Sequence, residues 1–435
     1  MTEELKARIA QINAGTAPAG YKKTKVGIVP EEWGICHFKK QFARLRRKNT
    51  EGNTNVLTIS AQYGLINQEE FFKKEVASED KSNYYLLFRG DFAYNKSYSN
   101  GYPFGAFKML DRYDSGVVSP LYICFTPTES NECPAFYVQY FENGMMNREI
   151  QAVAQEGARN HGLLNISIDD FFNSYLLCPP LPEQQKIAEI LTAQDAVIAL
   201  MQKQIELLQK QKKAFLQKMF PKKGCNVPKI RFAGFTDAWE QRKLGDVASN
   251  FEYGLNASAK EFDGENKYIR ITDIDDESRV FLSDDITSPD TDLTSADKYK
   301  LEKGDILFAR TGASVGKTYL YREKDGLVYY AGFLIRAKIN PENDAEFVFQ
   351  NTLTDSYDSF IRITSQRSGQ PGVNAQEYQG FSFYVPSLKE QQLIGTYFKN
   401  LDTLITFHQR KLEFEQQKKK ALMQLLLTGK VRVKT

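Results

Sequence analysis

The chain has 435 residues, of which 42% are hydrophobic and 13% aromatic, enough apolar material for two or more domains with buried cores. No stretch approaches the ~20 apolar residues of a membrane-spanning helix, and the start at Met1 lacks signal-peptide character, so we expect a cytoplasmic protein. The net charge is only +3, so bulk charge does not indicate a nucleic-acid binder, and any such surface must come from local clustering.

Residues 1–19 are predicted to form an N-terminal helical arm. Leu5, Ile9 and Ile12 fall on one face of an amphipathic helix, and Gly15 marks its end. We expect so short a helix to dock onto another element of the chain.

Residues 20–180 are predicted to form a first globular domain. A dense basic cluster lies near its start, with no acidic residue between Trp33 and Thr50. A solvated helix face usually alternates basic with acidic residues, so the cluster favours contact with phosphates, with a solvated face as the alternative. The cluster consists of Lys39, Lys40, Arg44, Arg46, Arg47 and Lys48.

Two further polar stretches of this domain carry side chains suited to reading bases and contacting a nucleic-acid backbone. The first stretch contains Asn95, Lys96 and Tyr98. The second contains Gln155, Arg159 and Asn160. Both are candidate DNA contacts.

Residues 181–222 are predicted to form a long helix. It opens with Glu183, Gln184 and Gln185, and Pro182 suits its first turn. Positions that alternate steps of four and three from Ile187 are mostly apolar, which indicates a coiled-coil seam. The basic turns of this helix and of its later repeat, which include Lys212 and Lys419, either follow a DNA spacer or form a solvated face.

Residues 223–386 repeat the signals of the first domain in the same order. Trp239 corresponds to Trp33, and the Gly304-Asp305 turn corresponds to Gly90-Asp91. Between these anchors the two regions hardly agree, which is the pattern of a duplicated scaffold whose surfaces have diverged.

The second domain has its own candidate DNA contacts. A Gly-rich loop offers Arg310, Thr311, Ser314 and Lys317. This loop ends like a phosphate-binding loop but has three rather than four residues between its glycines, so we do not expect a nucleotide site. Gln366, Arg367 and Gln370 occupy the place that matches the second polar stretch of the first domain.

Residues 387–435 are predicted to form a second long helix that repeats the first without a gap. Its opening, Glu390-Gln391-Gln392, follows Glu183-Gln184-Gln185 by 207 residues (390 minus 183). Ser387 and Glu390 form a capping box. Its seam is interrupted by His408 and Glu415, whose role the sequence leaves open.

Catalytic and metal-binding patterns do not stand out. The cysteines are scattered, have no C-x-x-C pair and are accompanied by only three histidines, so we expect free thiols and no zinc site or disulfide framework. No paired-carboxylate or Ser-His-Asp arrangement is recognisable, so we predict no catalytic residue. The cysteines are Cys36, Cys124, Cys133, Cys178 and Cys225.

Over essentially its whole length the chain resembles the specificity subunit of type I restriction-modification systems. The markers are the doubled Leu-x-Glu-Gln-Gln-x-Ile openings at 181–187 and 388–394, the Gly-Asp-Phe/Ile turns at 90–92 and 304–306, and the ending at 427–430. The resemblance implies an α+β fold. Two globular target recognition domains would be separated by two long antiparallel coiled-coil-like helices, as a pseudo-two-fold internal repeat.

The resemblance also implies a non-catalytic function. Each domain would read one half of a bipartite double-stranded DNA site, and the helices would set the spacing and hold two modification (methyltransferase) subunits, joined by restriction (translocase-nuclease) subunits. Glu183, Gln184, Gln185, Glu390, Gln391 and Gln392 are the predicted subunit-binding residues. S-adenosylmethionine, ATP and Mg²⁺ would serve the partner subunits, with no cofactor bound by this chain.

Two other hypotheses remain at this point. One is a self-contained DNA methyltransferase or nuclease, which the missing Asp/Asn-Pro-Pro-Tyr motif disfavours. The other is a coiled-coil scaffold for protein partners that does not read DNA.

Overall fold

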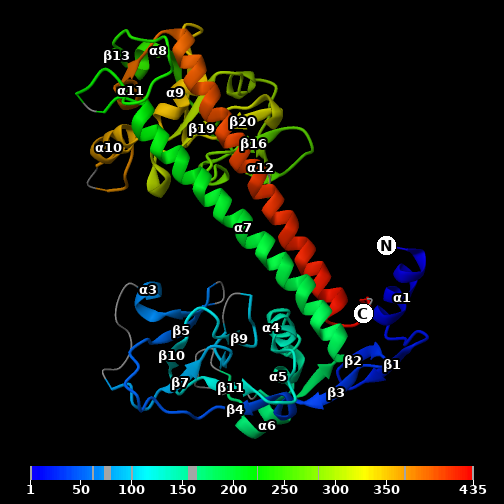
Figure 1. Ribbon diagram of the computed structural model, residues 1–435. Helices are drawn as coiled ribbons and strands as arrows, with labels where there is room; N and C mark the ends of the chain where they lie inside the picture. The colour runs from blue at the N-terminus through cyan, green and yellow to red at the C-terminus, as the bar shows by residue number, and fades with distance from the viewer. Residues whose placement is uncertain are drawn as a thin grey trace. The chain divides into compact units, whose positions relative to one another are not determined.

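The computed structural model describes residues 2–60, 63–72, 80–98, 101–154, 164–222, 224–282, 284–366 and 369–433. The chain divides into two compact units. Unit 1 comprises Met1–Ala199 and Glu413–Thr435, and unit 2 comprises Leu200–Leu412. Both units share the two long helices, α7 (Leu181–Met219) and α12 (Leu388–Leu426), so that each unit combines a globular domain with one part of each helix (Figure 1).

Unit 1 is built from short strands and helices before α7. Its helices are α1 (Glu3–Asn13), α2 (Phe38–Gln41), α3 (Gln68–Phe72), α4 (Pro134–Glu142), α5 (Asn147–Val153) and α6 (Ile168–Asn173). Its strands are β1 (Tyr21–Thr24), β2 (Gly27–Pro30), β3 (Gly34–His37), β4 (Phe42–Arg44), β5 (Leu57–Ser60), β6 (Gly64–Asn67), β7 (Tyr85–Phe88), β8 (Phe92–Asn95), β9 (Ala106–Met109), β10 (Ser115–Val118), β11 (Ile123–Pro127) and β12 (Tyr175–Cys178). The expected N-terminal helix is confirmed as α1, and Ile12 is its buried residue.

Unit 2 contains the elements between the long helices. Its helices are α8 (Leu244–Val247), α9 (Ala345–Asn351), α10 (Asp355–Thr364) and α11 (Ala375–Gln379), with single 3-10 turns at η1 (Ile271–Asp273), η2 (Asp297–Tyr299), η3 (Gly312–Ser314) and η4 (Glu323–Asp325). Its strands are β13 (Glu240–Lys243), β14 (Ala248–Tyr253), β15 (Ser258–Glu261), β16 (Lys267–Ile269), β17 (Thr287–Asp290), β18 (Asp305–Ala309), β19 (Thr318–Leu320), β20 (Val328–Tyr330), β21 (Leu334–Ile339) and β22 (Ser382–Val385).

The central sheets of the two units have the same strand order. Unit 1 has an antiparallel sheet in the order β4-β11-β8-β9, and unit 2 has one in the order β14-β21-β18-β19. The strand before each long helix also pairs with an early strand, β12 with β3 and β22 with β13. The duplication expected from sequence is therefore confirmed in the topology. Unit 2 adds a second four-stranded sheet, β15-β17-β16-β20, whereas unit 1 has the two-stranded sheets β5-β6 and β10-β7.

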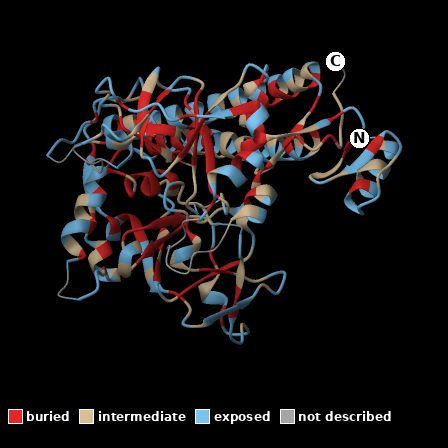
Figure 2. Ribbon diagram, turned by 90° about the horizontal axis from the view of Figure 1, so that it is seen from below, coloured by how far each residue is buried: buried red, intermediate tan, exposed pale blue. Residues whose placement is uncertain are grey.

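Each unit has an aromatic core between its central sheet and its helices. In unit 1, Phe38 packs against Phe42 and Phe171, with ring centroids 4.9 and 4.8 Å apart. In unit 2, Phe220 at the end of α7 stacks on Phe347, at 5.5 Å. Figure 2 shows the buried residues concentrated in strands and the exposed ones in loops and on outward helix faces. Burial of such rings stabilises each fold by about 1.5–3 kcal/mol per side chain.

The repeated Gly-Asp pairs form tight turns that begin β8 and β18. Gly90 and Gly304 both have φ of 93°, in the left-handed region that favours glycine. Asp91 Oδ2 accepts a hydrogen bond from Phe88 N at 2.7 Å, and Asp305 Oδ2 accepts one from Glu302 N at 2.9 Å. The backbone conformation of this turn therefore explains why the Gly-Asp dipeptide occurs in both domains.

The long helices are antiparallel within each unit. In unit 1 the first half of α7 meets the end of α12, where Gln194 Nε2 donates to Glu415 Oε2 at 2.6 Å. In unit 2 the second half of α7 meets the first half of α12, where Lys212 Nζ lies 2.6 Å from Asp402 Oδ1. Glu415, whose role the sequence left open, therefore pairs with Gln194, the polar residue in the seam of α7. His408 is half-buried, with its ring 5.7 Å from that of Phe407.

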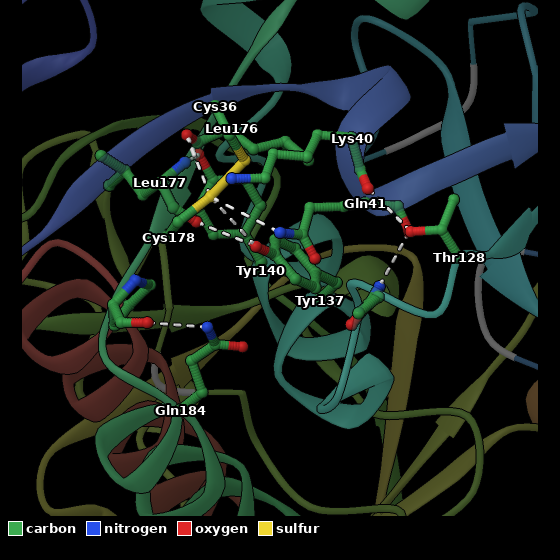
Figure 3. The surroundings of a disulfide bond; sticks show 12 residues. Cys36, Lys40, Gln41, Thr128, Tyr137, Tyr140, Leu176, Leu177, Cys178 and Gln184 are labelled. Carbon is green, nitrogen blue, oxygen red and sulfur yellow. Dashed lines mark hydrogen bonds between the residues drawn. A yellow bond between two sulfur atoms is a disulfide. The ribbon is translucent and has the colours of Figure 1, made fainter.

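Cys36 and Cys178 form a disulfide between β3 and β12 (Figure 3). The expectation of free thiols is therefore wrong for this pair. The two residues are 142 positions apart in sequence, but the pairing of Cys36 with Leu176 and of Gly34 with Cys178 makes them diagonal neighbours across the two strands, with Cα atoms 6.5 Å apart. Such a long-range register is not readable from cysteine spacing. The other three cysteines are free, and burial raises the pKa of the Cys124 thiol to about 12.

Over the described ranges, none of the helices combines the length and apolar character needed to cross a membrane. Among the same residues, no group of three or more His, Cys, Asp and Glu side chains is arranged to hold a metal ion.

Candidate nucleic-acid interface

In unit 2 the loop after β18 presents Arg310 between two exposed aromatic rings. The Arg310 guanidinium carbon lies 4.9 Å from the ring centroid of Tyr253 and 6.0 Å from that of Phe333. Both rings are more than 40% exposed. A guanidinium held over aromatic faces keeps its donors available in a fixed orientation, as recognition of base edges or phosphates requires.

This loop is joined by backbone hydrogen bonds to the segment before α11. Gly312 N donates to Pro371 O at 3.0 Å, and Val373 N donates to Arg310 O at 2.9 Å. Gln370 lies beside Gly312, since a Cβ atom at that glycine would be 3.0 Å from Gln370 Nε2. The structure therefore brings together Arg310, Thr311 and Gln370, which sequence analysis placed in two separate groups. Arg367 lies outside the described residues.

Lys317 and Ser314 have a different environment. Lys317 is buried, donates to Ile274 O at 3.0 Å and pairs with Asp276 at 2.5 Å. Lys317 therefore stabilises the loop from its buried side. Ser314 and Lys317 border a pocket of about 260 Å³ that Arg279 and Arg362 also line.

Unit 1 repeats this arrangement with other side chains. Leu164 N donates to Lys96 O at 3.1 Å, which is the counterpart of the bond from Val373 N to Arg310 O. In the loop after β8, Asn95 Oδ1 accepts from Ser97 N at 3.1 Å and Tyr98 is 66% exposed. Gln155, Arg159 and Asn160 lie outside the described residues. Asn95, Lys96 and Tyr98 stay predictions as DNA contacts.

The basic cluster at the start of the first domain contains exposed cations with partners in the same unit and exposed cations without one among the described residues. Arg47 lies 4.4 Å from the ring centroid of Phe88 and pairs with Asp91 at 3.2 Å. Lys48 Nζ donates to Asn83 O at 2.7 Å, and Lys39 Nζ donates to Asn173 Oδ1 at 2.7 Å.

The remaining members of the cluster are exposed as well. They are Lys40, Arg44 and Arg46. In the part of the chain that the structure describes, no ion pair or side-chain hydrogen bond engages these three cations. Exposed cations of this kind can neutralise phosphates, which releases condensed counterions from the nucleic acid.

The glutamates that open the long helices are buried in their own units. Glu183 is 1% exposed and accepts hydrogen bonds from Trp33 Nε1 at 2.8 Å and from Arg432 Nε at 2.6 Å. Glu390 is 0% exposed and accepts two from Arg231, at 2.7 and 2.8 Å. Paired and fully hydrogen-bonded carboxylates of this kind fix the start of each helix against its domain.

The two glutamines after each glutamate differ in exposure. Gln184 Nε2 donates to Pro179 O at 2.7 Å, and Gln391 Nε2 donates to Pro386 O at 3.0 Å, so both close the turn before the helix. Gln185 and Gln392 are exposed. The assignment of all six residues to subunit binding stays a prediction, and the last glutamine of each opening is the one that reaches the surface.

Sequence reasoning missed the arginines that meet these glutamates. Arg231 and Arg432 lie in matching tetrapeptides, Lys-Ile-Arg-Phe at 229–232 and Lys-Val-Arg-Val at 430–433, each following a long helix. The repeat is offset by 201 residues (432 minus 231) rather than 207, so the ungapped helix match does not include it. A search for short repeats after each helix would have found it.

Comparison with known proteins agrees with this duplicated frame. The family model of the type I restriction modification DNA specificity domain matches residues 34–210 and 236–415. The chain belongs to this family. Each matched range contains one globular domain and most of the long helix that follows it, so the specificity domain occurs twice.

Two relatives of the specificity family come from Methanocaldococcus jannaschii. The type I restriction enzyme MjaVIII specificity subunit is 26% identical over 284 residues, which are 63% of this chain and 66% of that protein. The putative type I restriction enzyme MjaX specificity subunit is 24% identical over 439 residues, 95% of this chain and 97% of that protein.

A crystal structure of a type I restriction-modification system S subunit from M. genitalium has the same fold. It aligns with a TM-score of 0.58 at 16% identity and covers 93% of this chain and 96% of that chain. The predicted fold class, two specificity domains with long helices, is confirmed.

Proposed function

We propose that this specificity-family chain reads a bipartite DNA site, with each globular domain reading one half and the long helices setting the spacing between the halves. One observation carries the proposal. Each domain joins the loop after the equivalent strand, β8 or β18, to the segment before α6 or α11 by the same backbone hydrogen bond, while the loops carry different side chains. One scaffold with two different sets of base-reading side chains suits two different half-sites.

The chemistry of the loops supports direct readout in the second domain. Arg310 and Gln370 are side chains that make paired hydrogen bonds to guanine and adenine edges in the major groove. In the first domain, Arg44 and Arg46 offer charge to phosphates, which position a protein without reading sequence.

The proposal gives this chain a non-catalytic role in a larger complex. Two modification subunits would transfer methyl groups from S-adenosylmethionine to adenine N6, and restriction subunits would use ATP and Mg²⁺. The internal repeat supports two copies of the modification subunit, because a doubled helix opening offers the same contact twice. The proposed work on chromosomal DNA implies a cytoplasmic protein.

The test is to express the chain with its modification subunit in a methylation-free host and to map N6-methyladenine along the genome. We expect one split motif with an unspecified centre. The double variant Arg310→Ala, Gln370→Ala should relax one half only, while Arg242→Ala, an exposed arginine paired with Glu240, should leave both halves unchanged. An unsplit motif, or relaxation of both halves by the loop variant, would contradict the proposal.

The two other hypotheses predict different results. If the purified chain alone methylates or cuts DNA, it is a self-contained enzyme. If it forms a stable complex that methylates nothing and binds no DNA, it is a scaffold.

A further inference from the structure

Unit 1 contains a cavity of about 570 Å³ that is lined by its central sheet, by α4 and by both long helices. Its apolar walls come from β8, β9 and α4. A cavity of this size that combines apolar walls with a few charged groups can bind a small ligand. The large apolar side chains of the lining are Phe92, Phe107, Met109, Val138 and Phe141.

The cavity has an equivalent place in unit 2, because the same backbone contacts set the register of the strands in both units. Leu110 N donates to Asp91 O at 2.8 Å, and Tyr321 N donates to Asp305 O at 3.0 Å. The two acceptors belong to the repeated Gly-Asp turns, so the two donors are equivalent as well. The residues that follow the donors therefore occupy the same position, and they are Asp111 and Arg322.

The helices that line this place, α4 and α9, are related by the same offset as the strands. Gln139 of α4 donates to Asp195 at 2.8 Å, and Gln350 of α9 donates to Asp402, the repeat of Asp195, at 3.1 Å. The two glutamines are 211 residues apart (350 minus 139), as are the two residues that follow the strands (322 minus 111). One offset therefore relates all the residues around this place in the two units.

In unit 2 the chain's own guanidinium occupies this place. Arg322 Nη2 donates to Glu346 Oε1 at 3.1 Å, and Arg322 Nη1 pairs with the second oxygen of the same carboxylate. The guanidinium carbon lies 5.9 Å from the ring centroid of Phe349. A guanidinium held by a carboxylate and an aromatic ring is thus part of the fold of unit 2.

Unit 1 lacks both members of this ion pair. Asp111 stands at the position of Arg322, and Ala135 stands at the position of Glu346 (346 minus 135 is 211). Both residues line the cavity. A carboxylate and a methyl group therefore lie where unit 2 has a guanidinium and its carboxylate partner.

The charges that line the cavity leave one carboxylate without a counterion. Lys108 pairs with Glu142, and Lys419 Nζ lies 2.5 Å from Asp195 Oδ1. Within the described part of the chain, the carboxylate of Asp111 forms no ion pair and no side-chain hydrogen bond. Three carboxylates and two ammonium groups give the lining one net negative charge. A cation is therefore the complementary ligand.

We propose that the unit 1 cavity binds a small organic cation, namely a guanidinium or primary ammonium group on a short apolar stem. The N–H donors of the cation meet the carboxylate of Asp111, and the stem packs against the rings of Phe107 and Phe141. The cation thus takes the place that Arg322 holds in unit 2. It is either a free molecule or the end of an Arg or Lys side chain of a partner protein.

The test titrates the full chain with n-butylguanidinium in a calorimeter, and thermal unfolding checks that each variant is folded. Asp111→Asn removes the carboxylate that has no counterion. Asp114→Asn is the matched control, because Asp114 lies three residues further along, pairs with Arg89 and is not part of the cavity lining. The double variant Asp111→Arg, Ala135→Glu introduces the ion pair of unit 2 into unit 1.

We expect saturable binding to the unchanged chain and to the Asp114→Asn control. Asp111→Asn should weaken binding by about threefold to tenfold, because one charge-assisted contact is lost. The double variant should bind at least about tenfold more weakly, because its own guanidinium occupies the cavity. Methylguanidinium should bind several-fold more weakly than n-butylguanidinium, because it lacks the apolar stem. The anion n-butyrate, which has a similar stem, should not bind.

Four results would overturn the inference. They are no saturable binding to the unchanged chain, unchanged affinity in Asp111→Asn, unchanged affinity in the double variant, and binding of n-butyrate as tight as that of n-butylguanidinium. A second titration, of the chain in complex with its modification subunit, distinguishes the two sources of the cation. Unchanged binding of n-butylguanidinium identifies a free molecule, and loss of binding identifies a side chain of the partner.

Discussion

Lys212 Nζ on α7 lies 2.6 Å from Asp402 Oδ1 on α12, and in the other unit Lys419 Nζ on α12 lies 2.5 Å from Asp195 Oδ1 on α7. The two ion pairs are copies of each other at the 207-residue offset. The second oxygen of each aspartate accepts a hydrogen bond from the globular domain, from Gln350 to Asp402 and from Gln139 to Asp195. Each carboxylate thus links three elements. Lys212 and Lys419 hold the two helices together. This role differs from both interpretations of the basic turns, which were contact with a DNA spacer and a solvated face.

The first prediction concerns these two lysines. Lys212→Met with Lys419→Met should destabilise the chain by about 1–3 kcal/mol, because each change leaves a partly buried carboxylate with less compensation. Lys213→Met with Lys420→Met, at exposed neighbouring positions, is the control and should change stability by less than about 0.5 kcal/mol. Urea unfolding of the full chain measures both. Equal effects would show that the inter-helix pairs add nothing specific.

The second prediction separates the residues of the helix openings. Glu390→Gln should lower the free energy of unfolding by about 2–4 kcal/mol, because the Arg231 guanidinium loses a buried carboxylate partner. Glu183→Gln should act in the same direction through Arg432. Gln185→Ala with Gln392→Ala should leave unfolding unchanged, since both side chains are exposed, and should weaken assembly with the modification subunit if these residues bind it. Unfolding by urea and native mass spectrometry give the two readings, and a stable Glu390→Gln chain would refute the structural role.

The third prediction concerns pH and Asp305. Burial raises the pKa of this carboxyl to about 6, and Arg336, 3.8 Å away, opposes the shift only in part. A folded-state pKa above the unfolded value of 3.8 means that the folded chain holds the proton more tightly. This group therefore lowers stability above pH 6, and the penalty, up to about 3 kcal/mol, disappears as pH falls toward 4.

The measurement is urea unfolding of the full chain at pH 5 and pH 7. Asp305→Asn should raise the free energy of unfolding at pH 7 by more than it does at pH 5, because the asparagine amide does not titrate. The asparagine Oδ1 atom can still accept the hydrogen bond from Glu302 N. Asp284→Asn, at an exposed position, should follow the unchanged chain. Parallel pH dependence in all three chains would contradict the shift.

The fourth prediction concerns phosphate contacts in the first domain. Arg44→Glu with Arg46→Glu should weaken DNA binding by the assembled complex for all sequences and reduce the slope of log K against log salt by about 1–2. Lys6→Glu with Lys23→Glu makes the same charge change at other exposed positions and should have little effect. Fluorescence anisotropy over a salt series provides the slopes. If both variants gave the same slope, Arg44 and Arg46 would not contact phosphates.

Sequence patterns predicted the long helices and the duplication well because both are encoded locally. The seam repeats every three to four residues, and α7 and α12 begin at Leu181 and Leu388, at or next to the predicted starts. The Glu-Gln-Gln openings were found for the same reason. Their internal partners were not, because Trp33 and Arg432 lie 150 and 249 residues from Glu183, and local periodicity carries no information about such contacts.

The residues of the candidate site were chosen by amino-acid type, which does not determine their exposure or their contacts. Arg310 and Gln370 were predicted in two separate loops, and their role as DNA contacts stays a prediction. The aromatic rings beside Arg310 gave no pattern of their own in the sequence, because Tyr253 lies at the end of β14 and Phe333 in the turn before β21. Lys317 looked like its loop neighbours in sequence, yet it is buried against Asp276. Exposure within a loop depends on the turn geometry, which residue type alone does not determine.

The contact between Arg432 and Glu183 has a consequence for synthesis. Unit 1 begins at the first residues of the chain, but it also needs the end of α12 and the tail, whose Lys430 meets Asn13 at 2.7 Å. Unit 2 is one continuous stretch of chain. On the ribosome, the domain translated first must therefore wait for the final residues before its last contacts can form, while the domain translated second has all its residues earlier.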